Sequence, residues 1–171
     1  TLPNIEGEPT YTQLAAILKE IKANAVSVPS VQGGGSIGHL GIVVSDAVYS
    51  TMAPGNPFIK PANPAQHPTI PHTSTDGAIT LIMPRHNESQ RKFQECNNVQ
   101  QALKNQLARA IDGIYLEAHK DNNVGYGNIS IEVLLQYLFD KNGDITPVDL
   151  RANKKRLNEE WGPSQPIQAL Y

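Results

Sequence analysis

The chain has 171 residues, a formal net charge of −2 and a hydrophobic content of 39%. This length is sufficient for one ordinary domain with a hydrophobic core, or for one domain with an additional arm. Because proteins that grip phosphate backbones usually carry an excess of basic residues, the balanced charge argues against nucleic acid as the main partner.

Cysteine content and hydropathy indicate the redox compartment of the protein and its relation to membranes. The single cysteine, Cys96, cannot form an intrachain disulfide, and we expect it to be a small buried residue in a reducing compartment. No run approaches the length of apolar sequence that spans a membrane, so a membrane partner is not predicted.

Composition divides the chain near residue 84. Residues 1–84 hold ten of the 13 prolines and eight of the 13 glycines, whereas residues 85–171 hold eleven basic and eleven acidic residues. Proline removes a backbone donor and restricts the residue before it, so long helices are not expected in the first part. The sequence therefore predicts an amino-terminal helix and a Gly/Pro-rich extended arm over 1–84, and a helical core over 85–171, joined in one compact unit.

The first predicted helix begins at Thr10. Thr10 and Gln13 have the spacing of a capping box. An apolar stripe at i, i+3, i+4 and i+7 follows, formed by Leu14, Ile17, Leu18 and Ile21. We expect this helix to end at Asn24, with a short strand over residues 25–28.

Residues 33–41 form a glycine-rich run. Such a run binds phosphate when a strand precedes it and a helix opens directly after it, but no Gly-Lys-Ser/Thr occurs here and the spacing fits no dinucleotide fingerprint. A turn that leads into a strand at 40–44 is predicted instead. Ser45 or Asp46 then caps a short helix through Met52.

The Pro- and Asn-rich residues 54–71 are interpreted as an ordered, irregular arm laid over the helical body and anchored by Phe58 and Ile59. Complete disorder of the arm is the alternative. Residues 80–83 fit either a second strand or packed coil.

Caps and apolar spacing predict four helices in the second half. Their expected extents are Asn87 to Ile111, Asp112 to Ala118, Ser130 to Asn142, and Thr146 to about Trp161. The fold class is therefore mainly α, a bundle of about five to six helices. Its core is expected to join Leu103, Leu107, Leu134, Leu138 and Leu157.

No catalytic or metal-binding set is visible in the sequence. His67 and His72 lie in the arm without a Cys or His at zinc-site spacing, and no combination of acid, base and nucleophile stands out. We therefore predict no enzymatic activity, no metal and no cofactor. A basic cluster is expected to be a solvated helix face, with weak RNA contact as the alternative; it comprises Arg151, Lys154, Lys155 and Arg156.

The order of motifs along the chain resembles the Gag, or capsid-region, polypeptide of Copia-type LTR retrotransposons. The residues that carry the resemblance are Thr10-Tyr11, the glycine-rich His-Leu segment, Pro57-Phe58-Ile59, Gly125-Tyr126, the run Ser130-Ile-Glu-Val-Leu-Leu-Gln-Tyr-Leu-Phe-Asp, Gly143-Asp-Ile-Thr-Pro, Asp149 to Leu157, and Trp161-Gly-Pro-Ser-Gln-Pro-Ile-Gln-Ala-Leu. The resemblance implies the amino-terminal part of a capsid-like region.

That resemblance implies a structural role, in which many copies associate as a shell or filament around element RNA in cytoplasmic virus-like particles. The Cys/His zinc knuckle common in this family is absent, so RNA would be bound by a segment outside this chain. Candidate assembly contacts are Tyr49, Phe58, Ile59, Tyr126 and Trp161, unless each packs in its own core. The alternative function is a host-adopted, monomeric protein-interaction module.

Overall fold

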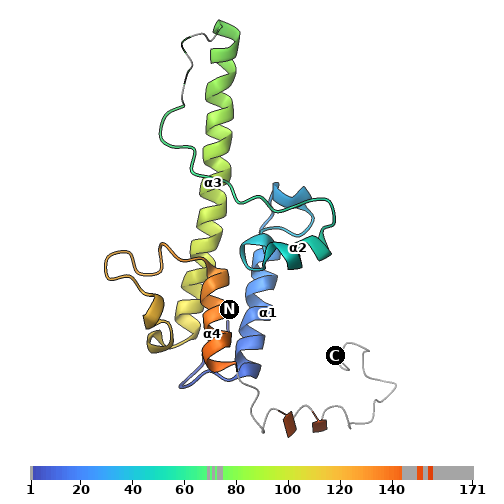
Figure 1. The fold of residues 1–171 in the computed structure, drawn as a ribbon, viewed down its shortest axis with the longest axis vertical. Helices are drawn as coiled ribbons and strands as arrows, with labels where there is room; N and C mark the ends of the chain where they lie inside the picture. The colour runs from blue at the N-terminus through green and yellow to red at the C-terminus, as the bar shows by residue number, and fades with distance from the viewer. Residues whose placement is uncertain are drawn as a thin grey trace.

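A computed structural model describes residues 2–68, 70, 72, 75–143, 150, 151, 154 and 155. Within these residues the protein is mainly α-helical, with four α-helices, four short 3-10 turns and no β-strand (Figure 1). The helices are α1 (Tyr11–Ser27), α2 (Asp46–Met52), α3 (Asp76–Ala110) and α4 (Ile131–Asn142). The predicted mainly α character is confirmed, but the described residues hold four helices instead of the five to six that were predicted. Apart from four isolated positions, the predicted helix from Thr146 to Trp161 lies outside the described residues.

Helix α1 begins with the predicted capping box, in which Thr10 and Gln13 cap each other. It continues three residues past Asn24, and the predicted strand over 25–28 is therefore wrong. The side chain of Asn24 donates to Gln106 Oε1 on α3 at 2.8 Å, while Ala25 is fully buried. This tertiary contact and the burial of Ala25 favour continuation of the helix over the local tendency of Asn to end it.

The core lies where α1, α4 and the carboxyl-terminal end of α3 meet (Figure 1). Four of the five leucines predicted for it are buried there, and the fifth, Leu157, lies outside the described residues. The main contributors from the three helices are Leu14, Ile17 and Ile21 of α1, Leu103, Leu107 and Ala110 of α3, and Leu134, Leu135 and Leu138 of α4. The amino terminus closes one end of this core, since Ile5 N donates to Ala110 O at 2.8 Å.

Helix α3 begins at Asp76, eleven residues before the cap predicted at Asn87. Residues 80–83 are therefore helical, and both the strand and the coil predicted for them are wrong. Pro84, which was expected to stand outside a helix, lies within α3. Figure 1 shows that the first half of α3 extends far beyond the rest of the body.

Two further segments form 3-10 turns instead of the predicted elements. The strand expected at 40–44 is η2 (Leu40–Ile42), where Leu40 O accepts from the amides of Val43 and Val44 at 2.9 and 3.2 Å. A short buried apolar run does not reveal from its periodicity whether it is strand or turn. The helix expected after Asp112 is a pair of turns, η3 (Gly113–Tyr115) and η4 (Glu117–His119); the predicted Asp112 cap is confirmed.

Candidate interaction surface

The Pro-rich arm lies beside α3. Its Ala65 carbonyl accepts from Gln90 Nε2 at 3.0 Å, and its Gln66 carbonyl lies 3.4 Å from His86 Nε2. At its beginning, Lys60 Nζ lies 3.7 Å from Glu132 Oε2 of α4. These contacts join the arm to its own chain at both its start and its middle.

An aromatic cluster anchors the start of the arm. Phe58 is only 6% exposed, and its ring lies 5.6 Å from that of Tyr49 and 6.3 Å from that of His39, measured between centroids. The glycine-rich segment closes over this cluster. A Cβ on Gly41 would clash with the Phe58 ring, and one on Gly33 would clash with the Tyr49 hydroxyl. The glycines therefore serve close packing here.

The candidate assembly contacts divide into buried and exposed residues. Tyr49 and Phe58 are buried, whereas the neighbouring Ile59 is 68% exposed. These three line one shallow pocket of about 380 Å³, together with Asp46, Ser50, Pro57 and Lys60. Tyr126 is half-buried and belongs to a different loop, and Trp161 lies outside the described residues. Of the basic cluster, Arg151, Lys154 and Lys155 are exposed, and Arg156 is outside the described residues.

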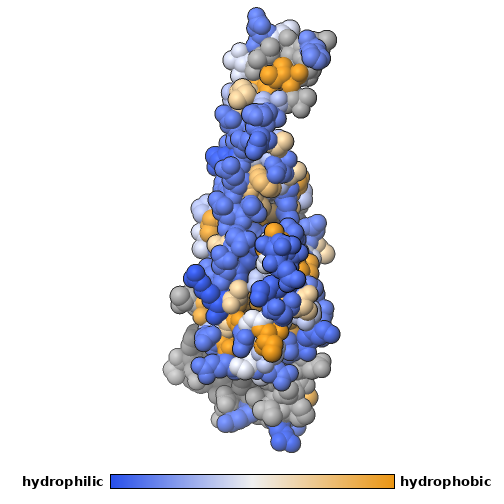
Figure 2. All heavy atoms as spheres, turned by 90° about the vertical axis from the view of Figure 1, so that its left-hand side faces the viewer, coloured by the Kyte–Doolittle hydropathy of each residue, from blue (hydrophilic) through white to orange (hydrophobic). Residues whose placement is uncertain are grey.

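The most exposed helical surface among the described residues is the projection, which we define as α3 residues 76–93 with arm residues 63–68, 70 and 72. Among the described side chains of α3, the buried ones all fall within its last eight residues, and none from 76 to 102 is buried. Apolar side chains in the projection are largely exposed, namely Ile70 (45%), Leu81 (52%) and Met83 (47%). In Figure 2, apolar residues reappear near the far end of a mostly hydrophilic shaft.

The part of the projection that precedes Glu88 is also poor in charge. Residues 61–87 contain Asp76 and Arg85 as their only residues of the types Asp, Glu, Lys and Arg, which is two of 27 residues. At the chain average of 18%, about five would be expected. Depletion of charge together with exposed Met and aliphatic residues is typical of the centre of a protein–protein interface.

Lys104 is a buried charged residue that the sequence did not single out. It is 2% exposed, and its ammonium group donates to three carbonyls, those of Tyr126 at 2.7 Å, Gly127 at 3.1 Å and Ile129 at 3.1 Å. Burial lowers the pKa of Lys104 below its ordinary value of 10.5. The three donors of the ammonium are all used, so this lysine fixes the loop that carries Tyr126. A signal was available, since position 104 shares the buried stripe of Leu107 and Ile111.

Replacing Lys104 by methionine is expected to lower the free energy of unfolding by about 2 kcal/mol, because the three carbonyls would lose a charged donor. Hydrogen exchange of residues 121–129 should accelerate in the same variant. The control is Lys92→Met on the same helix, whose side chain is 36% exposed and which should change stability by less than about 0.5 kcal/mol. Equal effects of the two substitutions would contradict the assignment.

The stability difference between the native chain and Lys104→Met should also depend on pH. Because burial lowers the pKa of Lys104 in the folded state, the unfolded chain binds more protons just below 10.5. As pH rises through that range, the native chain loses the free-energy penalty for burying the charge of Lys104. The stability advantage of the native chain over Lys104→Met should therefore grow. Chemical denaturation at two alkaline pH values measures it.

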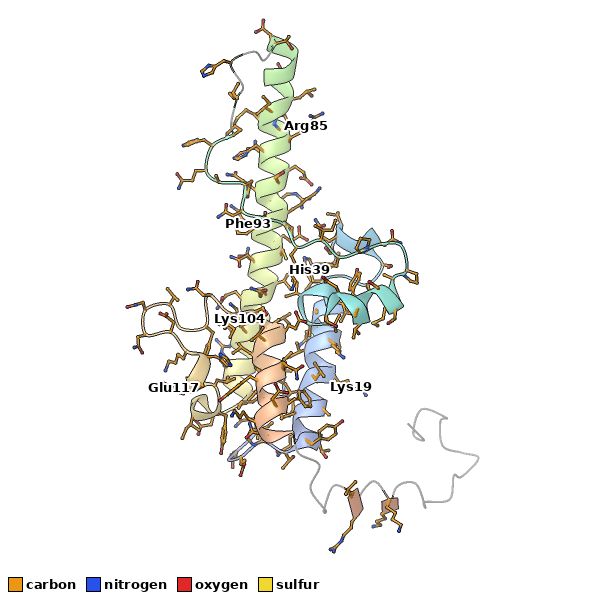
Figure 3. The ribbon with its side chains drawn as sticks, viewed as in Figure 1. Lys19, His39, Arg85, Phe93, Lys104 and Glu117 are labelled. Atoms are coloured by element: carbon orange, nitrogen blue, oxygen red, sulfur yellow. The ribbon has the colours of Figure 1, made fainter. Side chains whose placement is uncertain are left out.

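His39 is another buried polar residue, with 1% exposure. Its Nδ1 lies 3.1 Å from Val28 O, at the end of α1, and its Nε2 lies 3.8 Å from Glu95 Oε1 of α3. Figure 3 shows where His39 and Lys104 lie relative to α3. The sequence did not predict that either residue is buried, because their partners come from other elements.

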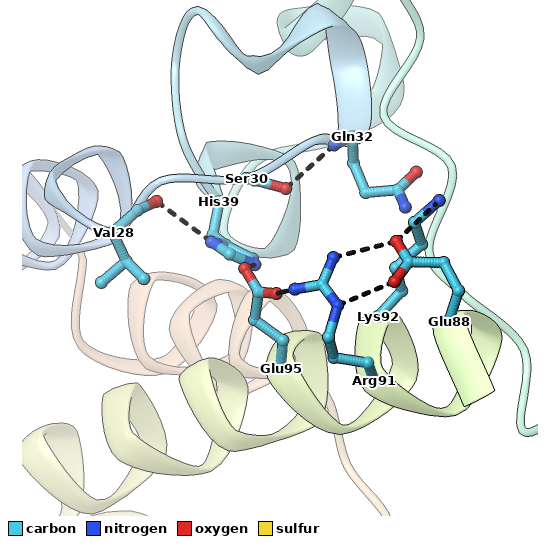
Figure 4. A network of polar contacts seen from close by, with 8 residues as sticks. All are labelled: Val28, Ser30, Gln32, His39, Glu88, Arg91, Lys92 and Glu95. Atoms are coloured by element: carbon cyan, nitrogen blue, oxygen red, sulfur yellow. Dashed lines mark hydrogen bonds and ion pairs between the residues drawn. The ribbon is translucent and has the colours of Figure 1, made fainter. Parts of the chain in front are cut away.

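Glu95 belongs to a row of charges along α3 (Figure 4). Arg91 bonds Glu95 at 3.1 Å and Glu88 at 2.9 Å, and Lys92 lies 3.5 Å from Glu88. The hydrogen bond from Arg91 is the main cause that lowers the pKa of Glu88 to about 2. The row thus holds Glu95 in place beside His39.

The described residues contain no group of three or more His, Cys, Asp or Glu side chains that could hold a metal ion. None of the helices in this part of the chain has the length and apolar character needed to cross a membrane. Cys96 is half-buried, and burial raises the pKa of its thiol.

In comparisons with known proteins, no family model matches the chain, and no curated protein or solved structure matches it significantly.

Proposed function

We propose that this chain is a structural, self-associating capsid-like protein of the kind found in the Gag region of Copia-type retrotransposons, and that its projection is a contact surface between copies. The observation that carries the proposal is the long unburied part of α3. From residue 76 to 102 the helix buries no described side chain, although three apolar residues of the projection are about half exposed.

A helix with this exposure gains little from packing within its own chain. Most helical stability in proteins comes from burial of an apolar face, and isolated helices are marginal in water. Pro84 removes one backbone hydrogen bond inside the projection and costs about 3 kcal/mol in a helix interior. Burial of Leu81 and Met83 against a partner would offset this cost.

The partner we propose is a second copy of the same chain. The resemblance supports this choice, since a capsid-like protein requires contacts that repeat between identical subunits, in closed or open arrangements. Element RNA would be bound by a segment outside this chain, because the chain has a net charge of −2 and carries no zinc knuckle.

Light scattering at two protein concentrations tests the proposal. The native chain should show a mass that rises with concentration. The double variant Leu81→Asp, Met83→Asp should raise the concentration at half-association at least about tenfold, since the free-energy cost of burying one charge in a contact exceeds about 1.4 kcal/mol.

The matched control is Ile114→Asp, which places the same charge at a 73% exposed position outside the projection and should leave association unchanged. Circular dichroism should show that each variant remains helical. A native chain that stays monomeric at all concentrations would instead support a monomeric protein-interaction module.

A further inference from the structure

The projection ends in a small apolar tip, which we define as Ile70 with α3 residues 76–83. Leu81 and Met83 of this tip are 52% and 47% exposed, and Ile70 is 45% exposed. The shaft that joins the tip to the body is different, since residues 84–92 include no Ala, Val, Leu, Ile, Met or Phe. Two α3 helices therefore lack a seam along their shafts, because paired helices need apolar side chains about every 3.5 residues.

The tip thus presents a few apolar side chains on a convex surface. A tip-to-tip contact would join two convex surfaces, and much of each side chain would remain in water. A concave apolar surface would contact the tip on several sides and remove more apolar area from water, which is the quantity that stabilises such a contact. A concave site on the body is therefore the better receptor for the tip.

The body carries such a site, a groove of about 200 Å³ where α1, α4 and residues 43–48 meet. Six of the ten described residues that line it are apolar, namely Leu18, Val43, Val44, Val48, Leu135 and Phe139. Val48 is 45% exposed, so the apolar lining reaches the surface. The groove is smaller than small-molecule sites, which measure about 300–1,000 Å³, and its size suits a few side chains.

The tip of the same chain does not reach this groove. Helices α1 and α4 pack against the carboxyl-terminal end of α3, whereas the tip lies at the amino-terminal end (Figure 1). Residues 81 and 103 of α3 are separated by about 33 Å at the helical rise of about 1.5 Å per residue. A tip that enters the groove therefore comes from another copy.

The charges of the two surfaces are complementary. Lys22 and Glu132 are the charged residues of the groove. Glu132 lies 3.7 Å from Lys60 of its own chain, whereas Lys22 forms no ion pair among the described residues. The tip carries one charged residue, Asp76, which likewise has no ion pair in the part of the chain that the structure describes. Opposite charges on the two surfaces favour their encounter and oppose contacts between like surfaces.

We propose that the groove receives the tip of a second copy of this chain. This inference rests on the proposed function and adds the partner surface to it. Because the tip and the groove are different surfaces, each copy inserts its tip into one neighbour and receives the tip of another. Such a heterologous contact generates a ring where the rotation between copies closes, and an open filament where it does not.

A mixing experiment tests the contact. The tip variant is Leu81→Asp, Met83→Asp, and the groove variant is Val48→Asp, in the first turn of α2, where an acidic side chain is compatible with the helix. Each variant alone should associate at least about tenfold more weakly than the native chain. An equal mixture should form a dimer, because the groove variant keeps its tip and the tip variant keeps its groove.

Sedimentation equilibrium should give the mixture twice the monomer mass, without further growth at concentrations where the native chain forms larger species. The matched control is Val124→Asp, at a 50% exposed position outside both surfaces, which should associate as the native chain does. Urea denaturation should give each variant a midpoint close to that of the native chain. If Val48→Asp does not fold, Lys22→Glu replaces it as the groove variant and should weaken association at least about threefold.

A groove variant that associates as strongly as the native chain would overturn the inference and leave the proposed function intact. A mixture that stays monomeric, although the native chain associates, would overturn it in the same way. A groove variant that is less stable but associates normally would mean that the groove is covered within its own chain, which also overturns the inference. A native chain that remains monomeric would contradict both the inference and the proposed function.

Discussion

Leu134→Ala is expected to lower the free energy of unfolding by about 2–5 kcal/mol, as truncation of buried leucines does. Leu134 is 1% exposed and lies on the face of α4 that packs into the core formed with α1 and α3. The three carbon atoms lost on truncation, Cγ and the two methyl groups, leave a cavity among these helices. A loss of this size is a large share of the 5–15 kcal/mol typical of a whole domain.

Urea denaturation followed by circular dichroism measures the effect. The adjacent substitution Val133→Ala is the matched control, because Val133 is 45% exposed on the same helix and should change stability by less than about 0.5 kcal/mol. A larger effect at Val133 than at Leu134 would mean that α4 is rotated about its axis relative to the arrangement described here.

Local signals were sufficient to predict three of the four helices. α1, α2 and α4 each begin after the predicted capping residue, Thr10, Ser45 and Ser130, whose side chain accepts from an amide in the first turn. Such caps involve residues only three positions apart, so they can be read directly from the sequence. The stop at Asn142-Gly143 was predicted in the same way.

The beginning of α3 could not be predicted because local signals oppose it. Pro84 and the change of composition near it favour a boundary, and Asn87 resembles a cap. The helix nevertheless passes through both positions, and the arm lies along it with bonds to His86 and Gln90. Contacts between segments some 20 residues apart are not encoded in periodicity.

The buried polar residues were missed for a related reason. Lys104 bonds carbonyls 22 to 25 residues further along the chain, and His39 lies between Val28 and Glu95. A lysine or histidine in a sequence is more often exposed or only partly buried, and only the fold shows which backbone oxygens surround it. These two residues locate the polar contacts that attach the Tyr126 loop and the base of the projection.

The arm shows how far sequence and structure agree on the candidate contacts. Phe58 and Ile59 were both expected to anchor it, yet only Phe58 is buried and Ile59 is exposed beside the shallow pocket. Successive side chains in extended backbone point to opposite sides, so one of such a pair faces the body and the other faces outward. Because Phe58 is buried and Ile59 is exposed, substitutions at the two positions can distinguish effects on folding from effects on association.

Phe58→Ser is expected to lower the free energy of unfolding by about 3–5 kcal/mol, the range for removing a buried aromatic side chain. The ring fills the space between Tyr49, His39 and Gly41. Gly41 has no side chain that could fill this space when the ring is removed. The serine hydroxyl would in addition be placed among largely apolar neighbours. Urea denaturation measures the loss.

Ile59→Ser is the matched control, since Ile59 is 68% exposed and the substitution should change stability by less than about 0.5 kcal/mol. If copies also contact each other through the arm, Ile59→Ser should weaken association in light scattering while the unfolding midpoint stays constant. In the alternative outcome, Ile59→Ser leaves association unchanged while Phe58→Ser abolishes it only where that variant is unfolded. That result would show that Phe58 supports assembly through the fold of its own subunit. A Phe58→Ser variant as stable as the native chain would remove the arm from the core and reverse the assignment of the two residues.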